Sequence, residues 1–117
     1  MGALLLTRAA FYILLSLVDE ERHGYGIMLE VTRLTEGAVR LNSATLYRSI
    51  KQLLAAGYLD QIDERPDPAL DDERRRYYRL TEAGKKAAEA EAVRLEQAVR
   101  LAEAKHLLRP GMGESRA

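Results

Sequence analysis

Cysteine and tryptophan are absent from this 117-residue chain, and no hydrophobic run is long. The lack of cysteine excludes disulfides, thiol chemistry and thiolate metal sites. The longest apolar stretch, around Phe11 to Val18, is shorter than half a membrane span. It also lacks the cleavage region that follows the apolar core of a signal peptide. We therefore expect a cytoplasmic protein with one modest core and no cofactor.

An excess of either charge is also absent, because 18 basic and 18 acidic residues give a formal net charge of zero. A neutral sum argues at first against a nucleic-acid binder. The distribution is uneven, however: within residues 39–58 the only charged residues are Arg40, Arg48 and Lys51. A second basic cluster lies at residues 74–79, and the acids concentrate between the two. A dimer could thus present a locally basic surface.

Features of an enzyme are missing as well. The histidines, His23 and His106, are far apart in the sequence, and no glycine-rich phosphate loop follows a predicted strand. His23 fits a turn residue bonded to the backbone better than a metal ligand. The adjacent carboxylates at residues 71–73 lie in a proline-containing stretch, where solvation is the default. The chain is therefore predicted not to be an enzyme and to hold no metal.

Residues 42–59 form the most informative stretch, because they predict one capped helix with two different faces. Ser43 suits the N-cap, and Gly57 can end the helix in the left-handed conformation. One apolar stripe comprises Leu46, Ile50, Leu53 and Leu54. The opposite face has no acid and comprises Thr45, Arg48 and Gln52, with Ser49 and Lys51 at its edges. Such a helix suits the major groove of DNA, although an ordinary surface helix has the same form.

Two short strands are predicted after this helix, at residues 58–65 and 74–80, from their rough alternation of apolar and polar side chains. Residues 66–73 contain two prolines and four acids, which is typical of a solvated loop. Because Tyr77 and Tyr78 alternate across the second strand, one of them is expected in the core. A helix of this kind followed directly by a β-hairpin is the plan of a winged helix.

Four segments carry a family resemblance, in order and in spacing: His23-Gly-Tyr-Gly-Ile27, Ala44-Thr-Leu-Tyr47, Leu53-Leu-Ala-Ala-Gly-Tyr-Leu59 and Arg75-Arg-Tyr-Tyr-Arg-Leu-Thr81. They resemble the motifs of the PadR-like transcriptional regulators over about residues 5–108. The resemblance implies DNA contact at the Thr-Leu-Tyr triplet and dimerisation through the C-terminal helix. Ala44 stands where the family often has glycine, and Arg48 where it often has proline. The family's half-site preference therefore cannot be carried over.

Three further helices are predicted around this unit. The first runs from Thr7 to about Asp19 and is apolar nearly all round, so we expect it to be buried on more than one side. The second spans about residues 25–35, and residues 39–41 follow as a brief extended piece. The last opens at Thr81 and continues to Leu108. Its heptad-like seam comprises Ala88, Ala92, Leu95, Val99 and Ala102.

The predicted fold is mainly α with a small β-hairpin. Residues 1–81 form a winged helix-turn-helix domain, 82–109 a C-terminal dimerisation helix packed with the first helix, and 110–117 a flexible tail. A projecting helix cannot bury its apolar seam alone, so we favour pairing with a second subunit over folding back on its own domain. Candidate dimer contacts are Phe11, Leu14, Leu15, Leu95, Val99 and Ala102.

Candidate DNA contacts come from three segments. They comprise Ser43, Thr45, Tyr47, Arg48, Lys51 and Gln52 in the two-faced helix, Tyr25 at the second helix, and Arg74 and Arg76 in the wing. Arginine pairs well with guanine and glutamine with adenine. The wing arginines, with Arg79, could instead pair with Asp63, Glu64 or Glu73 across the hairpin.

These features predict a homodimeric, sequence-specific DNA-binding transcriptional regulator, a repressor, that reads an inverted-repeat operator with the helix at about residues 43–56. The wing would contact the DNA backbone. The alternative is a winged-helix protein-interaction module without specific DNA binding. The resemblance also leaves open a small aromatic effector between subunits. Phe11 and Tyr12 are the aromatics placed to line such a space, although we favour simple packing of both at a dimer interface.

Overall fold

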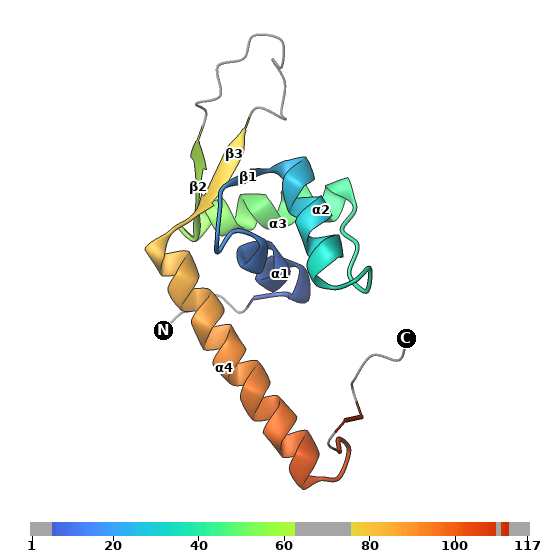
Figure 1. The fold of residues 1–117 in the computed structure, drawn as a ribbon. Helices are drawn as coiled ribbons and strands as arrows, with labels where there is room; N and C mark the ends of the chain where they lie inside the picture. Colours follow the sequence, from blue (N-terminus) through green and yellow to red (C-terminus); the bar gives the residue numbers. More distant parts are fainter. Residues whose placement is uncertain (1–5, 63–75, 110, 113–117) are drawn as a thin grey trace.

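A computed structural model describes residues 6–62, 76–109 and 111–112, and its fold is shown in Figure 1. The elements in chain order are α1 (Arg8–Ser16), β1 (Arg22–His23), α2 (Gly24–Leu34), α3 (Ser43–Ala55), β2 (Leu59–Ile62), β3 (Tyr77–Leu80) and α4 (Glu82–Ala104). The strands form one antiparallel sheet in the order β1-β3-β2. The architecture is a winged helix-turn-helix with a long C-terminal helix, which confirms the predicted fold class.

The core lies where α1, α2 and α3 pack together against the inner face of the sheet. Each helix contributes apolar residues at helical spacing, and the fully buried set includes Ile13, Leu14, Ile27, Val31, Leu46 and Leu53. The predicted stripe of α3 is confirmed, although Leu54 at its margin is only half-buried. Leu59 and Tyr78 close the core from the sheet. Burial of this single stripe leaves the opposite face of α3 in solvent.

The start of α3 differs by one residue from the prediction. Asn42, not Ser43, is the N-cap: its Oδ1 accepts a hydrogen bond from the Thr45 amide at 2.8 Å. Asn42 keeps the extended backbone that a cap requires, whereas Ser43 is already helical. Both side chains suit the position, so residue type alone could not choose between them. Thr7 and Thr81, where the first and last helices were expected to begin, are the N-caps of α1 and α4.

Three other boundaries differ from the sequence-based expectation. The first helix ends at Ser16 rather than near Asp19, and the Ser16 hydroxyl donates to the Ile13 carbonyl at 2.7 Å. Residues 39–41 form no strand, whereas Arg22–His23 forms the unpredicted strand β1. Two residues are too few to show a period. Helix α4 ends at Ala104, one turn earlier than expected.

The wing consists of β2 and β3, paired with Leu59 opposite Leu80 and Ile62 opposite Tyr77. The two predicted strands are confirmed over these shorter ranges. Tyr78 is buried and Tyr77 half-buried, as their alternation predicted. Residues 63–75, which include the predicted loop and Arg74, lie outside the described residues.

Helix α4 leaves the domain at the end of β3 and extends away from the other helices (Figure 1). Near its start it packs against α1, where Ala88 and Glu91 are buried. Farther along, Val93, Leu95, Val99 and Leu101 are all at least 40% exposed. Within residues 6–62 and 76–109, no helix combines the length and apolar character needed to cross a membrane.

Candidate nucleic-acid interface

The solvent-facing side of α3 is polar and basic. Its exposed residues are Ser43, Ala44, Arg48, Lys51, Gln52 and Ala55. Ala44, Arg48 and Ala55 follow one another at helical spacing, so Arg48 occupies the middle of this face between two small residues. Lys51 lies on one flank, and α3 contains no carboxylate. The face can therefore approach a polyanion closely with a guanidinium at its centre.

Two of the predicted contact residues of α3 are only partly accessible. Thr45 is half-buried, and its amide is bonded to the cap residue Asn42. Tyr47 is half-buried, and its phenol packs against Gly24 at the start of α2, where a Cβ would lie 2.3 Å from the hydroxyl oxygen. Tyr47 thus packs between α3 and the start of α2. Ser49, expected at the edge of the polar face, is buried.

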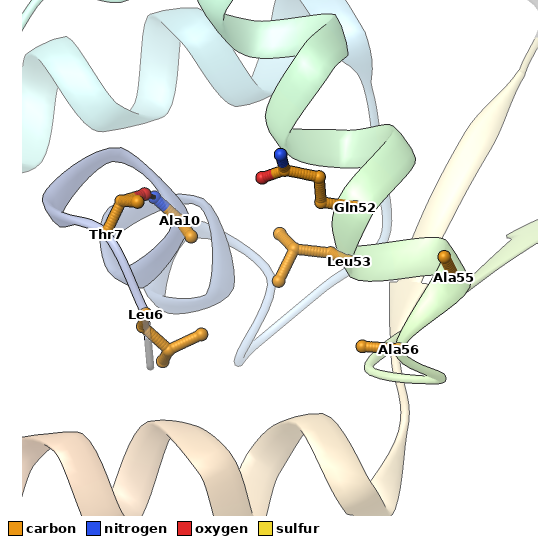
Figure 2. A pocket seen from close by; sticks show the side chains of 7 residues that line it. All are labelled: Leu6, Thr7, Ala10, Gln52, Leu53, Ala55 and Ala56. Carbon is orange, nitrogen blue, oxygen red and sulfur yellow. Dashed lines mark hydrogen bonds between the residues drawn. The ribbon is translucent and has the colours of Figure 1, made fainter. Parts of the chain in front are cut away.

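Gln52 lies on the flank of α3 that faces α1. It borders a groove with a cavity volume of about 490 Å³, lined by Leu6, Thr7, Ala10, Gln52, Leu53, Ala55 and Ala56. Figure 2 shows the Gln52 amide beside α1 rather than on the outermost side of α3. Of the three residues predicted to contact bases, Thr45, Arg48 and Gln52, Arg48 therefore has the most central position on the exposed face.

His23 and Tyr25 lie at the start of α2, near the base of the wing. The His23 Nδ1 accepts a hydrogen bond from the Gly26 amide at 3.0 Å, which makes His23 the N-cap of α2. The predicted hydrogen bond of His23 to the backbone is confirmed, although His23 lies in β1 rather than in a turn. Its ring meets Tyr77 edge to face, with centroids 5.3 Å apart. Tyr25 is 53% exposed in the first turn of α2.

The wing arginines have different surroundings. Arg79 lies directly opposite Asp60 across the hairpin, and its guanidinium is 3.4 Å from the Asp60 carboxylate. Both side chains are more than half exposed, so the pair adds little stability and can exchange for a phosphate contact. Arg76 is exposed at the start of β3. The partners that the sequence suggested, residues 63, 64 and 73, lie outside the described residues, as does Arg74.

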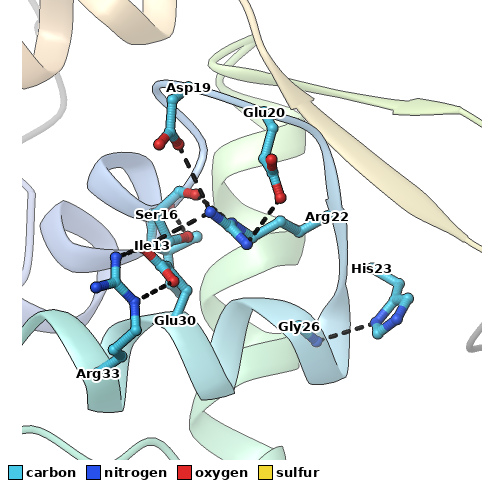
Figure 3. A network of polar contacts seen from close by, with 9 residues as sticks. All are labelled: Ile13, Ser16, Asp19, Glu20, Arg22, His23, Gly26, Glu30 and Arg33. Atoms are coloured by element: carbon cyan, nitrogen blue, oxygen red, sulfur yellow. Dashed lines mark hydrogen bonds and ion pairs between the residues drawn. The ribbon is translucent and has the colours of Figure 1, made fainter.

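The sequence did not predict the network of polar contacts around Arg22 (Figure 3). The Arg22 Nε donates to the Ser16 carbonyl at 2.7 Å, at the end of α1. Its terminal nitrogens lie 3.1 Å from the carboxylate of Glu20 and 3.6 Å from those of Asp19 and Glu30. Because Arg22 belongs to β1, which pairs with β3, the network connects the base of the wing to the helices.

Glu30 on α2 is the buried acid of this network. Its carboxylate accepts two hydrogen bonds from Arg33, at 2.9 and 2.6 Å. The Arg33 hydrogen bonds and the nearby positive charge of Arg22 hold the pKa of Glu30 below its ordinary range, although burial opposes the shift. The network therefore retains its negative centre at neutral pH.

Five of the six candidate dimer contacts retain accessible surface. Leu14 is the exception and a correction: it is completely buried in the core of its own chain. A helix that is apolar nearly all round does not reveal which side faces its own domain. Leu15 and Phe11 are half-buried on α1, whereas Leu95 and Val99 are exposed on α4. Ala102 is half-buried near the end of α4.

Phe11 and Tyr12 line a cavity of about 360 Å³ between α1 and α4. Their rings meet edge to face with centroids 5.8 Å apart. The other lining residues are Leu6, Arg8, Glu91, Arg94 and Leu95. Glu91 is buried and forms hydrogen bonds with Arg94, one of them at 3.0 Å from Nε. Within the described residues, no group of three or more His, Cys, Asp or Glu side chains could hold a metal ion.

Solved structures share this fold. A transcriptional regulator from Clostridium thermocellum aligns with a TM-score of 0.70 at 23% sequence identity, covering 82% of this chain and 87% of that one. A PadR family transcription regulator from Clostridium difficile aligns with a TM-score of 0.68 at 19% identity, covering 84% of this chain and 97% of the other. These identities establish similarity of fold alone. Among curated proteins, none matches the sequence.

The sequence itself matches the family model described as the transcriptional regulator PadR-like family, over residues 13–90. The matched residues extend from α1 through α2, α3 and the strands to the first turns of α4. They account for two thirds of the chain. This protein therefore belongs to the PadR-like family of transcriptional regulators.

Proposed function

We propose that this protein is a homodimeric, sequence-specific DNA-binding repressor that inserts α3 into the major groove. The observation that carries the proposal is the exposed face of α3, with Arg48 at its centre, Lys51 beside it and no acid on the helix. Arg48 can pair with the O6 and N7 atoms of guanine. The N-terminal end of α2, with Tyr25 exposed, and the exposed Arg76 and Arg79 of the wing are suited to backbone contacts.

Dimerisation is supported by the apolar side chains that α4 leaves in solvent. Val93, Leu95, Val99 and Leu101 are exposed on a helix that extends beyond its own domain. A second copy of α4 would cover part of this surface, together with the accessible parts of Phe11 and Leu15. Two-fold symmetry would then present two α3 helices to successive major grooves, which requires an inverted-repeat operator.

The test is binding of the purified protein to DNA from upstream of its own gene, against scrambled DNA of equal length, across a salt series. We expect salt-sensitive and preferential binding to the upstream fragment. Arg48→Ala should weaken it about 5- to 150-fold, the range of one base pairing. The control is Arg100→Ala, which removes an exposed arginine of α4 that pairs with Glu96.

Four results would contradict the proposal, in whole or in part. Equal and feeble binding to many DNAs, including a random library, would favour the winged-helix protein-interaction module. Equal losses in the two arginine variants would show a non-specific charge effect. A monomer at the concentrations that saturate DNA would exclude the dimeric form. Increased transcription from the bound promoter on adding the protein would replace repression by activation.

A further inference from the structure

The end of α3 and the start of α4 meet in a tight joint, which we define as Gly57, Tyr58, Thr81 and Gly84. The end of α3 is closed by a Schellman motif: the Gly57 amide donates to the Leu54 carbonyl at 3.0 Å and the Tyr58 amide to the Leu53 carbonyl at 2.9 Å. Gly57 has the positive φ of 81° that this motif requires. The turn leaves the Gly57 and Tyr58 carbonyls free to bond outside α3.

Thr81 bonds both of these carbonyls. Its hydroxyl donates to the Gly57 carbonyl at 2.7 Å, and its backbone amide donates to the Tyr58 carbonyl at 3.1 Å. The same hydroxyl oxygen accepts from the Gly84 amide at 3.0 Å and so caps α4. One side chain therefore bonds the end of α3 and the start of α4 at once.

Gly84 brings the two segments into direct contact. A Cβ at this position would lie 2.1 Å from the Tyr58 carbonyl oxygen and 2.9 Å from Leu80 Cδ1. The first contact is with backbone, which cannot rotate away as a flexible side chain could. Gly84 is buried in the first turn of α4 and lacks a positive φ, so packing rather than backbone conformation requires glycine here.

We propose that Thr81 and Gly84 are positioning residues that fix the angle between α3 and α4, and thereby set the half-site spacing that the dimer accepts. The proposal rests on the proposed function, because it takes α3 as the DNA-reading helix and α4 as the dimerisation helix. Neither residue needs to contact DNA or the second subunit. Both act through the direction in which α4 leaves the domain (Figure 1).

Because α4 is long, a small change in the angle between α3 and α4 moves the far end of α4 by a large distance. Its 23 residues extend about 35 Å at 1.5 Å per residue. A tilt of about 6° at the joint would displace its far end by about 3.6 Å, which is close to the 3.4 Å rise of one DNA base pair. A small change at Gly84 is therefore large enough to alter the register of two half-sites. When geometry forbids simultaneous engagement, the affinity gained from the second half-site is lost.

The experiment starts by selecting the preferred operator of the wild-type dimer from random DNA. Its half-sites are then kept constant while the distance between their centres is changed by one or two base pairs in each direction. Affinities are measured for wild type, Gly84→Ala, Thr81→Val and Thr81→Ser. The control Thr7→Val removes the equivalent cap of α1, which bonds the Ala10 amide at 3.0 Å, without touching the joint.

We expect wild type, Thr81→Ser and Thr7→Val to share one sharp spacing optimum. Gly84→Ala should bind that spacing about tenfold more weakly or worse, and should prefer another spacing or show no optimum. Thr81→Val should broaden the optimum. The affinity of each variant for a single half-site should equal that of wild type, a result that general destabilisation would not give. Circular dichroism and sedimentation establish that the compared variants are folded dimers.

The proposed role of Thr81 and Gly84 is refuted if the folded Gly84→Ala and Thr81→Val dimers keep the spacing optimum of wild type and its sharpness. It is also refuted if the wild-type dimer reads a specific half-site but tolerates every spacing equally. Failure of wild type to select any sequence is a different result. It contradicts the proposed function, and the positioning role then fails because it depends on that function. If Gly84→Ala does not fold, Thr81→Val with its matched Thr81→Ser decides.

Discussion

The phenol of Tyr47 lies so close to Gly24 that a side chain at residue 24 would overlap it. A Cβ there would be 2.3 Å from the Tyr47 hydroxyl oxygen and 2.9 Å from Cζ. Tyr47 belongs to α3 and Gly24 is the first residue of α2, so the two helices are in close contact here, beside the proposed DNA surface. Tyr47, which was expected to contact DNA, thus also packs inside the fold.

Gly24→Ala should destabilise the domain by about 1–3 kcal/mol, because the added methyl overpacks a well-filled contact. In a Tyr47→Leu background the same change should cost at least about 0.5 kcal/mol less, since the overlapping atoms are gone. Urea unfolding of the wild type, both single variants and the double variant provides the cycle. Strictly additive effects would mean that the ring moves aside without cost.

Glu30→Gln should lower stability by about 1 kcal/mol at neutral pH, because Arg33 and Arg22 lose their shared carboxylate. The pKa of Glu30 is lowered by Arg33 in the folded protein, so the folded state holds this proton less tightly than the unfolded state. The contribution is therefore complete above the ordinary value near 4.5 and is lost as the pH falls through the lower folded value.

The measurement for Glu30 is unfolding of wild type and Glu30→Gln from pH 7 to pH 3. The two stability curves should converge toward the acid end. Glu96→Gln is the matched control, because Glu96 forms an exposed pair with Arg100 and should change stability little at any pH. A gap between wild type and Glu30→Gln that persists unchanged at pH 3 would attribute the effect to the size or shape of the side chain.

His23→Ala should cost about 0.5–2 kcal/mol, the usual range for loss of an N-cap. His23→Asn should recover much of this loss, because asparagine also accepts a hydrogen bond from an amide of the first turn. Hydrogen exchange at the Gly26 amide, which His23 bonds, reports the cap directly. Equal stability of the two variants would show instead that the ring contact with Tyr77 is what matters.

Phe11→Ala should weaken the proposed dimer, because the ring is half-buried beside α4 and the rest of its surface is available to a second copy. The loss approaches about 3–5 kcal/mol if dimerisation buries the ring completely. Sedimentation over a concentration series measures it, with Leu107→Ala, an exposed position beyond α4, as the control. An unchanged dimer with a lost response to small aromatic compounds would identify the cavity as an effector site instead.

The sequence predicted α3 well because a strong helical period, at Leu46, Ile50 and Leu53, coincided with a glycine stop. It predicted the wing from alternation, which the burial of Tyr78 confirms. The sequence could not decide between neighbouring residues that suit the same role equally well. Asn42 and Ser43 both suit an N-cap, and only the backbone conformation decides between them.

Features that depend on tertiary contacts were also beyond the sequence. The two residues of β1 have no period of their own and become a strand only through pairing with β3. Leu14 could not be assigned to its own core rather than to a second subunit, because α1 is apolar on most sides. For the proposed DNA surface, the sequence was sufficient to predict that one face of α3 is basic and polar and has no acid. The sequence was not sufficient to predict that the Tyr47 ring packs against Gly24.

The position of β1 constrains the order in which the molecule can fold. Its partner strand β3 lies more than fifty residues later in the chain, and β2 pairs only with that same central strand. During synthesis, therefore, the sheet cannot begin to assemble until β3 has left the ribosome, although the three helices of the core are already complete. Until then, the ring contact between His23 and Tyr77 and the strand pairing of Arg22 with Tyr78 cannot form.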